Sequence, residues 1–194
     1  MAAEMTNLAT KNLSESDQGQ EIVSSVGMTV ALVSFAMLFA TLMMGFAMFR
    51  FAAPVWPPAG MVKPSLVLPG FSTLCIFFSS LSYIWFEKNI ANKKGLILTI
   101  ALGLGFMLMQ SLFWHQLKSQ GVFVSSGIFP SIIYAFTWIH AAHIVAALGL
   151  LFWLLFFAVN EMNTKALLRA SSVGKFWHFL GIVWLIMFLT IFVL

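Results

Sequence analysis

The sequence has very little charge. Only 8% of its 194 residues are charged and 61% are hydrophobic, with a mean hydropathy of +0.97, whereas roughly a quarter of residues are charged in soluble proteins. Water therefore cannot be the main solvent of this chain. Its apolar runs are long enough to cross a hydrocarbon core of about 30 Å with about 20 residues each. Backbone groups in lipid must be paired within a segment, which favours helices for continuous apolar runs.

Carboxylates are missing from all of the apolar runs. The six acidic residues lie in the N-terminal segment or at predicted span ends. They are Glu4, Glu15, Asp17, Glu21, Glu87 and Glu161. Because a pump or cation transporter normally needs a carboxylate at depth, we infer that this chain carries no proton or redox chemistry of its own and has no catalytic residue.

The sequence also lacks paired cysteines and a recognisable signal peptide. A single cysteine, Cys75, excludes an internal disulfide, and a packed thiol is the simplest interpretation. The polar start has no basic segment followed by a short apolar core and a cleavage site. We predict a disordered tail over residues 1–20 and one five-helix transmembrane domain over residues 21–194, without internal repeats.

Five spans account for the apolar runs. They are predicted at about 22–50, 66–86, 95–116, 128–159 and 176–194. The segment from Gln120 to Gly127 is too polar and too rich in glycine and serine for lipid, so one long fourth span is favoured over two short ones. Pro130 then falls in the first helical turn, where its missing N–H costs little.

The basic residues orient the chain. With the N-terminus in the cytoplasm, the inner segments contain Lys11, Lys88, Lys93, Lys94, Lys165, Arg169 and Lys175, and the outer segments contain Arg50, Lys63 and Lys118. This bias follows the positive-inside rule and places the C-terminus in the periplasm. The same rule explains the net charge of +4 without nucleic acid as a partner.

Two histidines share a face of the predicted fourth span. His140 and His143 are three residues apart and could bind a metal or haem, or form buried hydrogen-bonded contacts between helices. A haem would need a further ligand at the same depth, but His115 and His178 lie near span ends. We therefore favour packing. Gln110, on the glycine-containing third span, is likewise expected to bond across helices.

A second group of residues lies at the cytoplasmic end of the last span. Lys165, Arg169 and Lys175 could bind lipid head groups, although orientation of the chain would equally explain them. Trp177 and His178 follow directly, and a tryptophan near an interface commonly acts as an anchor. We predict a lipid-binding site formed by these five residues.

An ordered set of motifs resembles subunit III of the haem–copper respiratory oxidases, in a shorter form with five spans. The motifs are Gly27-Met28, Phe39-Ala40, Trp56-Pro57-Pro58, Ser72-Thr73, Ser79-Ser80, Leu102-Gly103-Leu104 with Phe106 and Gln110, Ser126-Gly127, His140-Ala141-Ala142-His143, Trp177-His178-Phe179 and Val183-Trp184-Leu185. Singly each motif is weak, but their order along almost the whole chain is specific. The Trp-Pro-Pro motif is more similar to the cytochrome c branch than to the quinol branch.

The resemblance implies a non-catalytic accessory subunit of a proton-translocating cytochrome c oxidase in the bacterial inner membrane. Its partners would be subunits I and II, which would carry the haem and copper, and membrane phospholipids held in a helix cleft. It would support proton uptake and the durability of the catalytic subunit. Membership of a respiratory supercomplex stays open. Alternatives are an accessory protein of a nitric oxide reductase or quinol oxidase, or a small-solute transporter, which predicts discontinuous spans or inverted repeats.

Three positions depart from the family pattern. Ser34 is followed by Phe35 where relatives usually carry a buried glutamate, Phe113-Trp114 stands where Glu-Tyr is common, and Gly181 stands where aspartate is common. A role in proton uptake that depends on the buried glutamate is therefore in question. Scaffold and lipid roles are unaffected.

Overall fold

The computed structural model describes the backbone of residues 2–54, 65–89, 92–158 and 164–193. Within these residues all regular structure is helical, and five helices are long and apolar enough to cross a membrane, as predicted. The helices are α1 (Ala2–Ala52), α2 (Val67–Lys88), α3 (Lys94–Ser119), α4 (Ile128–Trp153) and α5 (Thr164–Phe188). A 3₁₀ helix, η1 (Val124–Ser126), and two π-helical segments, η2 (Leu154–Ala158) and η3 (Leu189–Val193), complete the described elements.

The chain divides into two compact units, Met1–Leu38 and Phe39–Leu194. The first unit is the N-terminal part of α1, and its membrane-compatible segment starts at Ser25. Thr29 and Ser34 donate their hydroxyl hydrogens to carbonyls one turn earlier, at 2.9 Å each, so these polar side chains are satisfied within the helix. The helix includes residues 2–20, and the disorder predicted for this segment stays a prediction.

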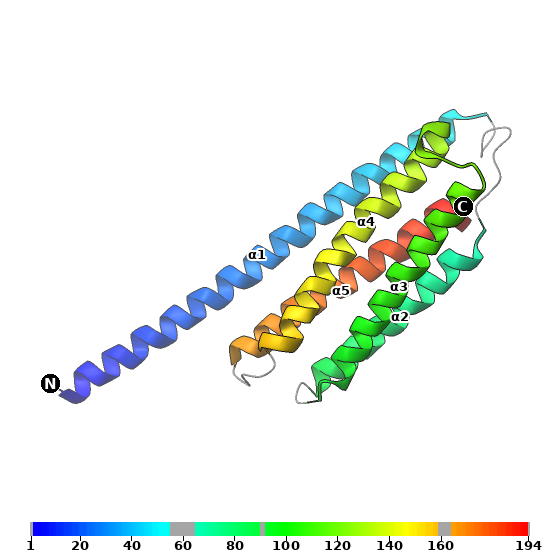
Figure 1. The fold of residues 1–194 in the computed structure, drawn as a ribbon. Coiled ribbons are helices and arrows are strands. Elements are labelled where there is room, and N and C mark those ends of the chain that lie inside the picture. Colours follow the sequence, from blue (N-terminus) through cyan, green and yellow to red (C-terminus); the bar gives the residue numbers. More distant parts are fainter. Residues whose placement is uncertain (1, 55–64, 90–91, 159–163, 194) are drawn as a thin grey trace. The chain divides into compact units, whose positions relative to one another are not determined.

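The second unit is built around a closed ring of four helices, in which α2 contacts α3 and α5, and α4 contacts the same two (Figure 1). The contact between α2 and α3 is especially close. A Cβ at Gly95 would lie 3.0 Å from the backbone nitrogen of Phe86, and Ser82 donates to the Gly95 carbonyl at 2.8 Å. Small residues thus allow two membrane helices to approach until hydroxyl groups bond across them.

The predicted break between the third and fourth spans is confirmed. Helix α3 ends at Ser119, and Gly121 and Gly127 adopt φ values of +74° and +142°, which other residues rarely reach. Helix α4 begins at Ile128 with Pro130 in its first turn, and its span continues to Phe156 as a single long crossing.

The fifth helix begins earlier than the apolar run suggested. The predicted span starts at residue 176, but α5 starts at Thr164. A helix needs no apolar residues where it extends beyond lipid. Hydropathy therefore locates the lipid-embedded part of the helix and misses its polar first turns. The extension places Arg169 and Lys175 on the helix itself.

Candidate functional site

Hydrogen bonds between side chains join α5, α2 and α3 in the interior of the ring. The indole N–H of Trp177 donates to the Ser79 hydroxyl at 3.1 Å, and that hydroxyl donates to the Thr99 carbonyl at 3.0 Å. All three residues are 0% exposed. A similar contact lies two helical turns further along α5, where the Trp184 N–H donates to the Thr73 hydroxyl at 3.0 Å. These contacts fix the depth of α5 against α2.

Tyr83 connects the same helices near the end of α2. Its hydroxyl donates to the Ala170 carbonyl at 2.7 Å, and its ring meets the His178 ring edge to face, with centroids 5.8 Å apart. A Cβ at Gly174 would collide with the Tyr83 ring and lie 2.5 Å from a Glu87 carboxylate oxygen. Glycine is therefore required where α5 passes over this tyrosine and carboxylate.

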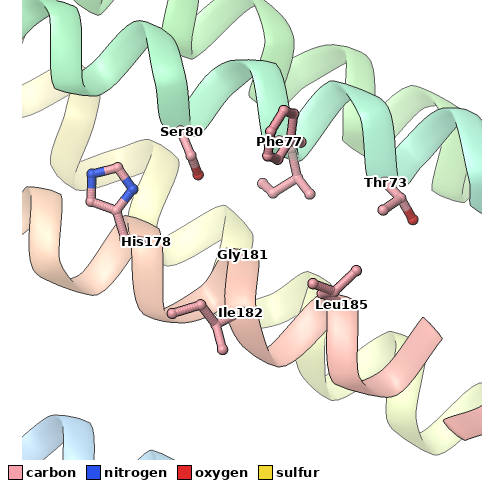
Figure 2. A pocket seen from close by; sticks show the side chains of 8 residues that line it. Thr73, Phe77, Ser80, His178, Gly181, Ile182 and Leu185 are labelled. Carbon is pink, nitrogen blue, oxygen red and sulfur yellow. The ribbon is translucent and has the colours of Figure 1, made fainter. Parts of the chain in front are cut away.

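A cavity of about 300 Å³ lies between α2 and α5, just deeper than Tyr83. Its lining is mostly apolar and includes Ile76, Phe77, Ile182 and Leu185, while the absence of a side chain at Gly181 helps to open it. Figure 2 shows Ser80 and His178 at one end of this cavity, projecting from facing helices. Nε2 of His178 is buried and has no hydrogen-bond partner within the described structure. The cavity therefore has an apolar body with polar side chains at both ends, and the Thr73 hydroxyl at the far end is already bonded to the Pro69 carbonyl and the Trp184 N–H.

The cavity opens toward an exposed apolar surface of this chain. The side chains of Phe77, Ile182 and Leu185 are 57%, 59% and 47% exposed. Large apolar groups exposed to this extent are stable only against hydrocarbon or another protein.

The structure only partly brings together the residues predicted to bind lipid. The guanidinium of Arg169 lies 5.5 Å from the centroid of the Trp153 ring, on the α4 side, whereas Lys175 interacts electrostatically with Glu87 at the end of α2. These two cations therefore interact with different helices, α4 and α2. His178 lines the cavity, and the side chain of Lys165 lies outside the described residues.

Trp177 requires a correction. We predicted that it contacts lipid near the membrane interface, but it is fully buried and bonded to Ser79. The sequence placed it near a span end because the apolar run starts at residue 176. Since α5 begins more than two turns earlier, Trp177 lies within the bundle instead.

The predicted packing residues form a second cluster in the interior. The His140 ring lies 5.2 Å from the Trp184 ring and 5.9 Å from the Phe106 ring, between centroids, so α3, α4 and α5 meet here. His143 packs on Phe39 at 5.6 Å, and its Nδ1 donates to the Ile139 carbonyl at 2.7 Å. The structure thus gives the two histidines different environments.

Gln110 and His140 depart from the expected bonding. Both were predicted to form hydrogen bonds across helices, and both are buried, but their side-chain polar atoms have no partner among the described residues. No group of three or more metal-ligating side chains occurs in the described part of the chain. The expected absence of a cofactor stays a prediction, and Trp56, Pro57 and Pro58 lie outside the described residues.

Sequence reasoning missed Tyr83 and the pair formed by Trp114 and Thr137, whose indole N–H and hydroxyl bond at 3.0 Å between α3 and α4. A signal for Tyr83 was present, because the chain has only 2 tyrosines and this one follows the serine-rich stretch of the second span. A tyrosine inside a membrane helix needs a partner for its hydroxyl. Only the folded chain identifies that partner as a backbone carbonyl of α5.

Comparison with known proteins relates this fold to one family. The family model described as cytochrome c oxidase subunit III matches residues 13–194. Similar curated proteins include cytochrome c oxidase subunit 3 of Synechocystis, 22% identical over 100% of this chain and 85% of that protein. A probable cytochrome c oxidase subunit 3 of Mycobacterium leprae is 31% identical over 87% of this chain and 86% of its own length.

The match extends to longer relatives. Cytochrome c oxidase subunit 3 of Schizophyllum commune is 30% identical over 71% of this chain, which corresponds to 53% of that protein. The apolar helices make the present chain a multi-pass membrane protein. With a match to nearly its full length, the chain belongs to the cytochrome c oxidase subunit III family.

Proposed function

We propose that this chain is a non-catalytic accessory subunit of an aerobic terminal oxidase, packed against subunit I in a complex that also contains subunit II. The observation that carries the proposal is the family match over residues 13–194. The clustering of motif residues His140 and Trp184 inside the bundle supports a structural role for them. Haem and copper would be held by the partners, and the N-terminus would face the cytoplasm and the C-terminus the periplasm.

Copurification tests this assignment. The tagged chain, extracted in mild detergent, should retain a haem-bearing subunit I and a copper-bearing subunit II in stoichiometric amounts. Failure to retain a subunit I, or stoichiometric binding of haem or copper by the isolated chain, would contradict it. Retention of a nitric oxide reductase instead of a copper-bearing subunit II would identify the alternative partner.

The proposed contribution to the complex is support of proton uptake and of the durability of subunit I. Since Phe35 occupies the position of the usual buried glutamate, the support would be structural, through helix packing and bound lipid. Oxidase preparations with and without this chain should differ in how long they sustain turnover. Equal lifetimes and equal rates of proton uptake would exclude the supporting role.

The cavity between α2 and α5 provides the proposed cleft for phospholipid. Lys175 lies one helical turn from His178 on α5, so a phosphate near Lys175 would place an acyl chain beside the cavity. Phe77 and Ile182 would contact that chain, while Glu87 beside Lys175 would discriminate against a second negative charge. Arg169, which is stacked on Trp153, would not share this head group.

A side chain at position 181 would test the lipid cleft. A Cβ there would lie 3.3 Å from the Ser80 hydroxyl oxygen, so Gly181→Leu should fill the cavity and lower the amount of tightly bound phospholipid, measured by native mass spectrometry. Gly149→Leu is the matched control, because nothing lies within 4 Å of a Cβ at that position. Equal lipid retention in both variants would refute binding in this cavity.

A further inference from the structure

Two polar side chains in the protein interior have unsatisfied hydrogen-bonding atoms. Gln110 is 1% exposed and His140 is 0% exposed. Neither atom of the Gln110 amide and neither ring nitrogen of His140 has a partner among the described residues. The great majority of buried polar atoms in proteins form hydrogen bonds, either with other protein groups or with ordered water. Four such atoms therefore require a common explanation.

Helix register places both side chains in one layer. A Cβ at Gly103 would lie 2.9 Å from Leu148 of α4 and 2.8 Å from Trp177 of α5, so this face of α3 points between those helices. Gln110 lies two helical turns further along the same face. Because Gly103 faces Leu148 and Trp114 bonds to Thr137, α4 runs antiparallel to α3.

A step of the same length along α4 and α5, starting from the residues that face Gly103, identifies the residues that lie beside Gln110. Counting seven residues back from Leu148 on the antiparallel α4 leads to Ala141, next to His140, and counting seven forward from Trp177 on α5 leads to Trp184. The rings of His140 and Trp184 are 5.2 Å apart, so His140 lies in this layer. The amide of Gln110 consequently faces the layer that contains the His140 ring.

The surrounding groups are already paired or apolar. The Trp184 N–H donates to Thr73, and the Thr137 hydroxyl donates to the Ile133 carbonyl while accepting from Trp114. Phe39 and Phe106 cover other sides of the His140 ring, at centroid distances of 6.0 and 5.9 Å. The Trp184 and Thr137 side chains therefore have no N–H or O–H left to donate to these four atoms.

A direct bond between the two residues would be insufficient. The two nitrogens of an imidazole point to opposite sides of the ring, so a single amide group reaches only one of them. One nitrogen of His140 and one atom of Gln110 would stay unpaired, and each buried unpaired group is destabilising. A water molecule can make two to four hydrogen bonds and serve as donor and acceptor together.

We propose that α3, α4 and α5 enclose a hydration site, in which at least one water molecule bridges the Gln110 amide and the His140 ring. The site lies at the centre of the bundle, on a different pair of helices from the cavity between α2 and α5. Its ligand is water, because Phe39, Phe106 and Trp184 surround the His140 ring with aromatic groups and no acidic side chain is among its described ring contacts. The site is independent of the proposed oxidase partners.

Magnetisation transfer from water to labelled histidine tests this site. The full chain, with ¹⁵N-histidine and embedded in lipid nanodiscs, contains 4 histidines. The signal that disappears in His140→Phe identifies His140. In the unmodified protein the His140 ring should receive magnetisation from bound water, and Gln110→Leu should reduce that transfer several-fold. Absence of transfer in the unmodified protein would overturn the proposal.

A matched control separates the site from general packing effects. Gln116→Leu makes the same change on α3 but on a different face, and it should leave the transfer to His140 unchanged. If Gln110→Leu also left it unchanged, the bridging role of Gln110 would be excluded. Should the Gln110 variant fail to fold, cryo-electron microscopy of the unmodified protein still decides, because it should show water density between the two side chains. A direct contact without that density would contradict the proposal.

Discussion

The indole N–H of Trp177 donates a hydrogen bond to the hydroxyl of Ser79, 3.1 Å away and fully enclosed between α5 and α2. The Ser79 hydroxyl in turn donates a hydrogen bond to the Thr99 carbonyl of α3. A single serine thus couples three helices. In a membrane protein, where apolar side chains gain little by leaving lipid, such contacts and close packing supply much of the specificity of assembly.

Removal of this hydroxyl should destabilise the bundle. We expect Ser79→Ala to lower the free energy of unfolding in detergent by about 1–2 kcal/mol, because it removes two interhelical hydrogen bonds of about 0.6 kcal/mol or more each. Ser111→Ala is the control, since that exposed hydroxyl bonds only within α3. If Ser79→Ala and Trp177→Phe were strictly additive in the double variant, the two residues would not be coupled.

Close approach at Gly103 makes a second prediction. Gly103→Ala should cost about 1–3 kcal/mol, because the added methyl group would overlap Trp177 and Leu148 inside a packed core. Gly149→Ala should instead be neutral or stabilising by up to about 1 kcal/mol, as expected for alanine in an open helix position. Thermal unfolding of both variants measures the difference. The opposite order would mean that α3, α4 and α5 are not in contact at this point.

Tyr83→Phe isolates the hydrogen bond to the Ala170 carbonyl. The substitution keeps the ring contacts with Phe86 and His178 and removes only the hydroxyl, so a loss of about 0.5–1.5 kcal/mol is expected. Tyr83→Leu should cost more, because it also removes the ring. Equal stability of the unmodified protein and Tyr83→Phe would show that the hydroxyl does not join α2 to α5.

Carbodiimide labelling tests the absence of a buried acid in α1. Reagents that modify buried carboxylates should not label the segment Ser25–Ala52, which has no aspartate or glutamate. The variant Phe35→Glu provides a positive control, because it places a carboxylate next to Ser34. Mass spectrometry of the fragments locates the label. A modified residue in this segment of the unmodified chain would contradict the interpretation of α1.

The sequence by itself determined the number of helices and much of their extent. Long runs without charge permit only helices in hydrocarbon, and the polar segment before Gly127 requires a break between α3 and α4. The order of short motifs was also sufficient to indicate the family, since each motif is a local property of the chain. The predicted fifth span, 176–194, did not indicate that α5 begins at Thr164, because hydropathy does not mark a helix beyond the membrane.

Only the tertiary structure decided which polar residues meet. Trp177 changed from a predicted lipid contact to a buried donor, because its environment depends on how far α5 extends past it. Arg169 and Lys175, close in sequence, interact with residues of different helices. Gln110, His140 and Trp184 come from distant segments and share a layer through helix register. Such contacts depend on rotation and depth of whole helices, which no local pattern encodes.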